Sequence, residues 1–231
     1  MSIVLVTGGN KGLGRETARR LVELGHTVYV GSRDPVRGRD AVDEVGAHLL
    51  VLDVTDDKSV ASAASELARR EGRLDVLINN AGIADEPSDL DQLTISDVQR
   101  IFDVNVFGAV RAIHSFLPLL HKAAVPVIVN VTSGLGSFGL ITDSSRSESE
   151  NLIPAYGSSK AALNMLTLQY AKALPTFKIN AAVPGYTSTD LTGNGAGQSV
   201  WEGSEAIVAL AVIDAEGPTG TLSDRHGPLP W

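Results

Sequence analysis

The sequence predicts a single α/β domain with a doubly wound parallel sheet of seven strands and helices on both faces. Short apolar runs alternate with longer stretches of helical periodicity along most of the 231 residues. The first run, residues 3–6, leads directly into a glycine-rich turn and then a helix, the order found where an α/β sheet binds a nucleotide. No internal repeat or linker divides the chain, so one domain is expected.

The composition excludes several classes of protein. There is no cysteine, which rules out disulfides, thiolate chemistry and cysteine-ligated metal. The five histidines lack the spacing of metal ligands, so no metal site is predicted, and a net charge of −8 argues against a nucleic-acid partner. No run approaches the roughly 20 apolar residues of a membrane span, and the chain starts without a signal-peptide core. We therefore expect a cytoplasmic protein without a membrane partner.

The first half of the chain predicts a nucleotide site. Apolar runs predict strands at 3–6, 27–30, 47–52 and 74–78, and helical periodicity predicts helices at 12–24, 35–45 and 57–70. The turn after the first strand has the motif Thr-Gly-x-x-x-Gly-x-Gly, and the residues expected to contact the cofactor are Gly8, Asn10, Lys11, Gly12, Leu13 and Gly14. Its backbone N–H groups and the helix N-terminus would hold a pyrophosphate. A tight turn without a ligand is the alternative.

The end of the second strand predicts which dinucleotide binds. This strand is followed by Ser32, Arg33 and Asp34. An arginine here suits the 2′-phosphate of NADP, and Lys11 could add a second positive charge, whereas an acidic residue would favour the ribose of NAD. We expect NADP, with NAD possible, because Asp34 lies one residue further on and can point away. Solvated surface charges are the alternative for both cations.

Two further strand ends could contact the same nucleotide. Asp53, followed by Val54, could accept a hydrogen bond from an adenine amino group or cap the next turn. After the fourth strand, the small residues of Asn80-Ala81-Gly82 allow close approach to a ribose, and asparagine side chains there can pin neighbouring strands.

The second half of the chain predicts the catalytic groups. We expect a helix over 94–121, strands over 125–131, 177–183 and 219–222, a helix that carries Tyr156 and runs to residue 174, and a last helix over 204–213. Tyr156 and Lys160 lie one helical turn apart, so the ammonium would lower the pKa of the phenol, which could then exchange a proton with a carbonyl or alcohol oxygen. Ser133 follows a strand, where ligands bind in open α/β sheets, although serine is also a common turn former. Asn105, inside the long helix, is expected to bend it or to hold a water.

Two segments are candidates for the substrate pocket. Residues 134–154 form a long connection whose second half is poor in apolar residues and predicts an exposed loop. Residues 190–203 are rich in Gly, Asn, Ser and Thr and predict a mobile lid or a loose connection. Neither segment, nor residues 84–93, contains a pattern that identifies the substrate.

In order along the chain, these motifs resemble the short-chain dehydrogenase/reductase family. The resemblance runs from residue 3 to at least residue 191, and its residues are Thr7, Gly8, Gly12, Gly14, Asn79 to Gly82, Asn105, Ser133, Tyr156, Lys160, Pro184, Gly185 and Thr189. The residues from Thr7 to Gly12 and from 217 to 231 are most similar to the carbonyl-reductase-like branch. Family members commonly have fewer residues between the serine and the tyrosine.

The resemblance implies a Rossmann-type sheet in the strand order 3-2-1-4-5-6-7 and reversible hydride transfer between NADP(H) and a small-molecule carbonyl or secondary alcohol. Tyr156 would donate the proton and Ser133 would orient the substrate oxygen. Lys160 would lower the Tyr156 pKa and hold the nicotinamide ribose, while Asn105 would bind a relay water. The nicotinamide end would meet the turn that contains Pro184, Gly185, Thr187 and Thr189.

Two alternatives stay open at this point. One is a different enzyme on the same scaffold, either an NAD-dependent alcohol dehydrogenase or a 3-oxoacyl-carrier-protein reductase. The other is a non-catalytic NADP-sensing regulator, which the presence of both Tyr156 and Lys160 disfavours. The family implies a homodimer or homotetramer through residues 94–121 and 155–174, although the carbonyl-reductase-like branch includes monomers.

Overall fold

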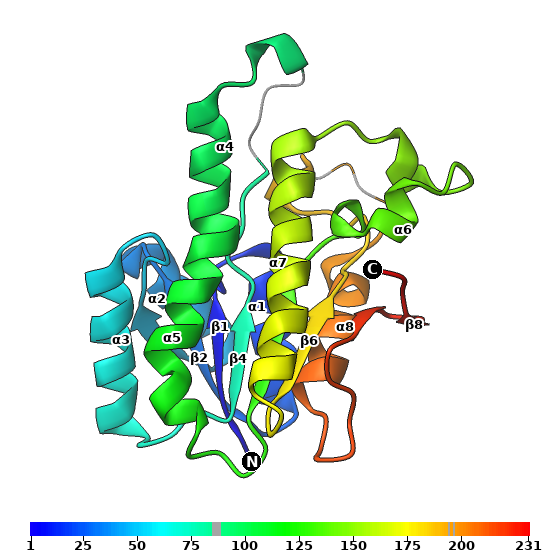
Figure 1. Ribbon diagram of the computed structural model, residues 1–231. Coiled ribbons are helices and arrows are strands. Elements are labelled where there is room, and N and C mark those ends of the chain that lie inside the picture. Colours follow the sequence, from blue (N-terminus) through cyan, green and yellow to red (C-terminus); the bar gives the residue numbers. More distant parts are fainter. Residues whose placement is uncertain (85–88, 194, 196) are drawn as a thin grey trace.

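The computed structural model of the protein describes residues 1–84, 89–193, 195 and 197–231. Within these ranges, eight strands form one sheet in the order β3-β2-β1-β4-β5-β6-β7-β8 (Figure 1). The strands are β1 (Ile3–Thr7), β2 (Thr27–Ser32), β3 (His48–Val51), β4 (Val76–Asn79), β5 (Val127–Val131), β6 (Lys178–Ala182), β7 (Leu222–Asp224) and β8 (Gly227–Pro228). The first seven pair in parallel and confirm the predicted order. The short β8, which is antiparallel to β7, makes the sheet one strand larger than predicted.

Helices cover both faces of the sheet, as predicted. They are α1 (Gly12–Glu23), α2 (Pro35–Val45), α3 (Asp57–Arg70), α4 (Ile95–Phe102), α5 (Gly108–Leu120), α6 (Phe138–Ile141), α7 (Pro154–Ala173) and α8 (Val200–Ala211). Helices α3, α5 and α7 cover one face, and α1, α2 and α8 cover the other (Figure 1). Strand β1 is buried on both sides, because Ile3 and Leu5 belong to one core cluster while Val4 and Val6 belong to the other. This arrangement explains why β1 is a continuous apolar run.

The strand order reverses between β1 and β4, which both lie at the centre of the sheet. Val4 pairs with Val28 of β2 on one side and with Val76 of β4 on the other. The carboxyl ends of the parallel strands all point to one end of the molecule, where the crevice at such a reversal is the usual ligand site. Figure 1 shows α4, α6 and the first turn of α7 at this end, far from the N terminus.

Several predicted boundaries differ from the structure for local reasons. The predicted strand 125–131 begins only at Val127, because Pro126 has no N–H to donate to a ladder. The predicted strand 219–222 is shifted to 222–224, since Gly220 adopts a φ of 70° that a strand does not allow. The predicted helix 204–213 begins earlier, at Val200, because Ser199 and Glu202 form a capping box.

The predicted long helix over 94–121 is interrupted. α4 and α5 are joined by a π-helical turn from Asp103 to Phe107, with Asn105 in its centre. Asn105 therefore lies in a π-helical turn, a feature that is frequent at functional sites.

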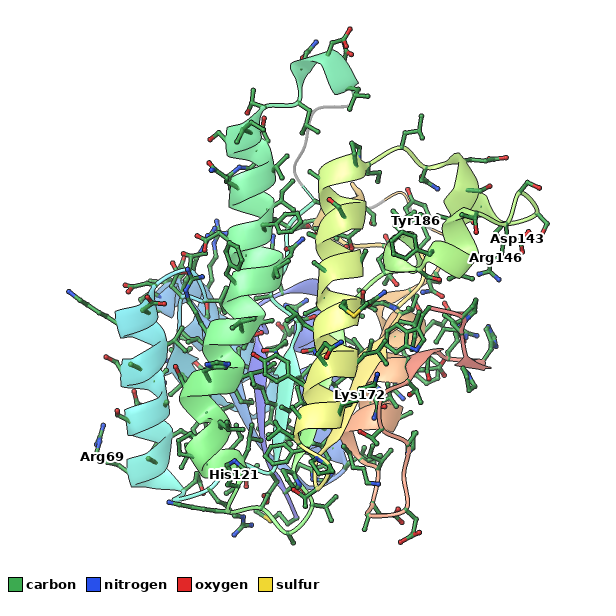
Figure 2. The ribbon with its side chains drawn as sticks, in the orientation of Figure 1. Arg69, His121, Asp143, Arg146, Lys172 and Tyr186 are labelled. Carbon is green, nitrogen blue, oxygen red and sulfur yellow. The ribbon has the colours of Figure 1, made fainter. Side chains whose placement is uncertain are left out.

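The long segment 134–154 contains more regular structure than an exposed loop. Short 3-10 turns at Gly134–Gly136 and Ser147–Glu150 flank α6. Two short runs, residues 141–145 and 150–152, are exposed throughout, and Figure 2 shows Asp143 at the outer edge of the segment. Ser137 caps α6 by accepting a hydrogen bond from the N–H of Leu140 (3.1 Å), and its hydroxyl donates to the carbonyl of Pro230 (2.7 Å). The segment is thus held against the last residues of the chain.

The described helices give no candidate for a membrane span, since none combines sufficient length with sufficient hydropathy.

Candidate active site

The glycine-rich turn after β1 packs directly on the end of β4. A Cβ atom on Gly8 would lie 2.9 Å from the Cα of Ala81, and one on Gly14 would overlap the Nδ2 atom of Asn80. Asn80 Nδ2 in turn donates to the carbonyls of Thr7 (2.9 Å) and Gly8 (3.2 Å). Glycine is therefore required at positions 8 and 14 by space alone, and Asn80 ties the end of β4 to Thr7, at the end of β1, and to the turn.

The N-terminus of α1 is open. Lys11 is its N-cap residue, and no described side chain caps this end. Gly12 has a φ of 51°, which favours glycine. A cavity of about 320 Å³ adjoins the turn and is lined in part by Lys11, Gly12, Arg15, Thr189 and Asp190. Uncapped N–H groups at the positive end of a helix dipole suit a phosphate, so this turn fits the predicted pyrophosphate.

The cations beside this cavity already have anionic partners. Lys11 Nζ lies 2.7 Å from Asp190 Oδ2, and Arg15 lies 2.7 Å from Glu44. Arg33 is exposed at the end of β2. A phosphate at this position would have to compete with Asp190 for the Lys11 ammonium.

Asp34 is committed to local structure. Its Oδ1 atom accepts hydrogen bonds from the N–H groups of Val36 (2.9 Å) and Arg37 (3.1 Å), which makes it the N-cap of α2. The hydroxyl of the buried Ser32 donates to the Asp34 carbonyl (2.8 Å). Asp34 therefore acts as the cap of this helix.

The remaining predicted contacts on the nucleotide side are partly structural. Asp53 Oδ1 accepts from the backbone N–H (2.9 Å) and the hydroxyl (2.7 Å) of Thr55, so the turn-capping alternative is present. Val54 packs on α5, where a Cβ on Gly108 would lie 2.9 Å from its Cγ2 atom. Leu13 packs against the core cluster beneath α1, and Asn10 is half-buried in the turn.

The turn after β6 folds over the glycine-rich turn. Thr189 Cγ2 would lie 3.5 Å from a Cβ on Gly12. Gly185 has a φ of 75°, and the hydroxyl of the buried Thr187 donates to the carbonyls of Pro184 (3.2 Å) and Gly185 (3.3 Å). The structure therefore brings Thr189 to the glycine-rich turn, while contact of Pro184, Gly185, Thr187 and Thr189 with the nicotinamide stays a prediction. Of the predicted lid 190–203, residues 194 and 196 lie outside the described residues, as do 85–88 of the segment 84–93.

Asn105 links the π-helical turn to two other parts of the site. Its Nδ2 atom donates to the carbonyl of Ile83 (2.9 Å) and to the Ser159 hydroxyl (3.0 Å), and its Oδ1 accepts from the N–H of Ile83 (2.8 Å). A Cβ on Gly82 would lie 3.4 Å from Asn105 Oδ1 and 3.5 Å from Lys160 Nζ. Asn105 and Lys160 thus meet at the small residue predicted to approach a ribose. The relay water stays a prediction.

Ser133 and Tyr156 meet at the carboxyl end of β5. The Ser133 hydroxyl forms a hydrogen bond with the Tyr156 phenol. Lys160 Nζ lies 5.6 Å from the centroid of the Tyr156 ring and donates to the carbonyl of Val131 (2.9 Å). The structure therefore brings together the four residues predicted to be catalytic. Asn105 is connected to α7 by its hydrogen bond to Ser159, and it lies next to Gly82, as does Lys160.

Burial controls the protonation of the tyrosine and the lysine. It raises the pKa of Tyr156 to about 12, while the hydrogen bond with Ser133 acts in the opposite direction. Burial also lowers the pKa of Lys160 to about 8. Removal from water therefore dominates the pKa of Tyr156 in this state, and the expected lowering by Lys160 stays a prediction.

Some residues that build the site were missed by reasoning from the sequence. Thr7 Oγ1 accepts from the N–H groups of Asn80 (3.0 Å) and Ala81 (3.1 Å). Gln198 Nε2 donates to the Pro184 carbonyl and to the Thr187 hydroxyl (2.8 Å). Thr7 belongs to the glycine motif, which gives it no role of its own, whereas no sequence signal marks Gln198.

Comparison with known proteins identifies the class. A family profile described as short chain dehydrogenase matches residues 2–198. The short-chain dehydrogenase/reductase ATR10 of Stachybotrys chlorohalonatus (strain IBT 40285) is 34% identical, over 97% of this chain and 88% of that protein. The protein therefore belongs to the short-chain dehydrogenase/reductase family.

More specific similarities point to reductases and dehydrogenases of carbonyl and alcohol groups. The (+)-neomenthol dehydrogenase of Capsicum annuum is 29% identical over 96% of this chain and 95% of that protein. The crystal structure of NADPH-bound carbonyl reductase from chicken fatty liver has a TM-score of 0.87, 26% identity, and covers 100% of this chain and 99% of that chain. The structure of salutaridine reductase from Papaver somniferum has a TM-score of 0.85 and 26% identity, and the match covers 96% of this chain and 99% of that chain. The protein is accordingly an oxidoreductase of carbonyl or alcohol groups that uses a nicotinamide cofactor.

Proposed function

We propose that the protein is an NADP(H)-dependent reductase that transfers a hydride between the nicotinamide and a carbonyl or secondary alcohol, with Tyr156 as the acid/base. The observation that carries this proposal is the hydrogen bond between Ser133 and Tyr156, beside Lys160, at the carboxyl end of the sheet. Two hydroxyl groups converge there on one point, which is what a carbonyl oxygen needs as it gains negative charge.

When bound, the nicotinamide supplies or accepts the hydride. Tyr156 is protonated at neutral pH because burial raises its pKa to about 12, so it holds the proton that reduction requires. Ser133 orients the substrate oxygen and shares its developing charge. The Lys160 ammonium, one helical turn from the phenol, favours the tyrosinate that proton donation leaves behind.

The choice of NADP over NAD rests on the end of β2. Asp34 is the N-cap of α2, and this favours the proposal that its carboxylate does not bind the ribose. Arg33 is exposed beside it, and Lys11 stands at the edge of the cavity near the glycine-rich turn. The NADPH bound to the chicken carbonyl reductase, whose fold matches over the whole of this chain, supports the same choice. A cytoplasmic location and a homodimer or homotetramer stay predictions.

A cofactor titration tests the first half of this proposal. Purified protein is titrated with NADPH and NADH in parallel at one salt concentration, followed by cofactor fluorescence. We expect tighter binding of NADPH, and Arg33→Ala should weaken NADPH binding more than NADH binding. Equal or tighter binding of NADH would contradict the NADP assignment.

A turnover assay tests the chemistry. The protein is assayed for loss of NADPH with a panel of ketones and aldehydes, and for the reverse reaction with alcohols that include (+)-neomenthol. Tyr156→Phe should lower turnover by about 10²- to 10⁴-fold, the usual contribution of a general acid, and should leave NADPH binding intact. Unchanged turnover in this variant would overturn the mechanism.

A further inference from the structure

Two buried side chains, Thr132 and Asn164, join the chain around Ser133 to the helix that carries Tyr156 and Lys160. Thr132 Oγ1 donates to Asn164 Oδ1 over 2.6 Å, and Asn164 Nδ2 donates to the carbonyl of Gly136 over 3.0 Å. Thr132 is 3% exposed and Asn164 is 4% exposed. One hydrogen bond therefore starts at the residue before Ser133 and the other ends three residues after it.

Asn164 is well placed to hold a fixed geometry. It lies on α7 one turn after Lys160 and two turns after Tyr156, on the same face of the helix. Any backbone segment bonded to Asn164 is therefore set in register with both catalytic side chains. The same segment is anchored to the sheet, since the N–H of Thr132 donates to the carbonyl of Ala182 (2.8 Å).

The contact between this segment and α7 is unusually close. A Cβ on Gly136 would lie 2.6 Å from the carbonyl carbon of Lys160 and 2.8 Å from the N atom of Ala161. The backbone of residues 134–136 thus rests on the backbone of the helix, with no side chain between them at this point. A single 3-10 turn is a weak unit by itself, so the side-chain hydrogen bonds of Asn164 fix the position of this turn along α7.

We propose that Thr132 and Asn164 are positioning residues that hold the Ser133 segment on α7 in the register where the Ser133 hydroxyl meets the Tyr156 phenol. Neither residue touches the reacting atoms, and the effect on turnover rests on the proposed function. Without the two bonds, the segment keeps its anchors at the Thr132 N–H and the Ser137 hydroxyl, but no hydrogen bond to Asn164 sets its position along α7. A misplacement of about 1 Å at a reacting centre can cost about 10²-fold in rate.

Kinetics in two backgrounds test this role. Asn164→Leu and Thr132→Val remove the bonds at similar side-chain size, Thr132→Ser keeps the hydroxyl, and Gln169→Leu on the exposed face of α7 is the matched control. We expect Asn164→Leu and Thr132→Val to lower kcat by about 10- to 100-fold. Thr132→Ser and Gln169→Leu should stay within about twofold of the wild type, as should the Kd for NADPH in all four variants.

The decisive comparison uses Ser133→Ala as the second background. If Asn164 acts through Ser133, then Asn164→Leu should change the residual kcat of the Ser133→Ala protein by less than about twofold. An equal fold loss in both backgrounds would show that Asn164 acts elsewhere and would overturn the proposal. So would a Thr132→Ser variant that is as impaired as Thr132→Val.

Hydrogen–deuterium exchange provides a readout that needs no turnover. The N–H groups of Gly136 and Ser137 donate within the turn, to the carbonyls of Ser133 and Gly134 (3.0 Å each). These amides should exchange faster than in the wild type in Asn164→Leu, and their exchange rates should be unchanged in Gln169→Leu. Unchanged exchange in Asn164→Leu would overturn the positioning role. A wild-type protein that reduces no carbonyl would contradict the proposed function instead, and the exchange result would still decide the role of Asn164.

Discussion

The buried ammonium of Lys160 should give the protein an unusual dependence of stability on alkaline pH. Lys160 is 4% exposed, and its Nζ atom donates to one carbonyl, that of Val131, at 2.9 Å. Burial lowers its pKa from 10.5 to about 8. Since removal from water is the cause, the charged form is what the folded state disfavours.

The sign follows from proton binding by the two states. Below pH 8 the lysine is charged in both the folded and the unfolded chain, so the full cost of burying the charge is present. Between pH 8 and about 10 the unfolded chain binds more protons than the folded one, so the free energy of unfolding rises with pH. The fall in pKa from 10.5 to about 8 corresponds to roughly 3 kcal/mol, at about 1.36 kcal/mol for each pKa unit.

Urea unfolding of the cofactor-free protein between pH 7 and pH 10 measures this effect. Lys160→Met replaces the ammonium with an apolar side chain of similar length. The variant should be more stable than the wild type at pH 7, and this advantage should shrink by roughly 3 kcal/mol toward pH 10. Lys58→Met, at an exposed position of α3, controls for the loss of a lysine. Parallel curves for Lys160→Met and the wild type would refute the reasoning.

Three other variants test contacts elsewhere in the site. Gly14→Ala would force its Cβ into Asn80 Nδ2, so we expect a loss of about 1–3 kcal/mol in thermal unfolding together with weaker NADPH binding; an unchanged Tm would contradict the packing argument. Asp190→Asn releases the Lys11 ammonium from an exposed ion pair and should tighten NADPH binding by up to about fivefold without a matching change for NADH. Equal changes for both cofactors would show that Lys11 does not meet the 2′-phosphate. Asn105→Ala removes three hydrogen bonds around the π-helical turn, and we expect urea unfolding to show a loss of about 1–3 kcal/mol; full retention of stability would mean that these bonds contribute little.

The fold and the general position of the site could be predicted because both depend on strand ends. A parallel sheet places the residues that follow each strand at one edge, whatever the detailed packing. Ser133 after β5, Gly82 after β4 and the turn at Gly8 therefore had to lie near one another once the alternation of strands and helices was recognised. The two-residue β8 has no apolar pattern and was missed for that reason.

The partners of these residues could not be predicted because they depend on how elements far apart in the sequence meet. Asn164 and Thr132 are separated by 32 residues, and their bond depends on the registration of α7 against β5. The pairing of Lys11 with Asp190 spans 179 residues and lies at the cavity beside the glycine-rich turn. Spacing along one helix predicts that Tyr156 and Lys160 are neighbours, but it contains no information about these crossings.

The pKa values of Tyr156 and Lys160 show why spacing alone also misjudges electrostatics. A lysine one turn from a tyrosine produces a net fall in the pKa of the phenol only if the effect of its charge exceeds the effect of burial. Here Tyr156 is 8% exposed, and its pKa rises to about 12. The same exclusion of water strengthens every charge interaction that remains, because the effective dielectric constant is lower. A substrate oxygen that gains negative charge between Ser133 and Tyr156 would therefore be stabilised strongly by the two hydroxyls. The burial that opposes ionisation of the free tyrosine thus also strengthens the hydrogen bond that its phenol donates to such an acceptor.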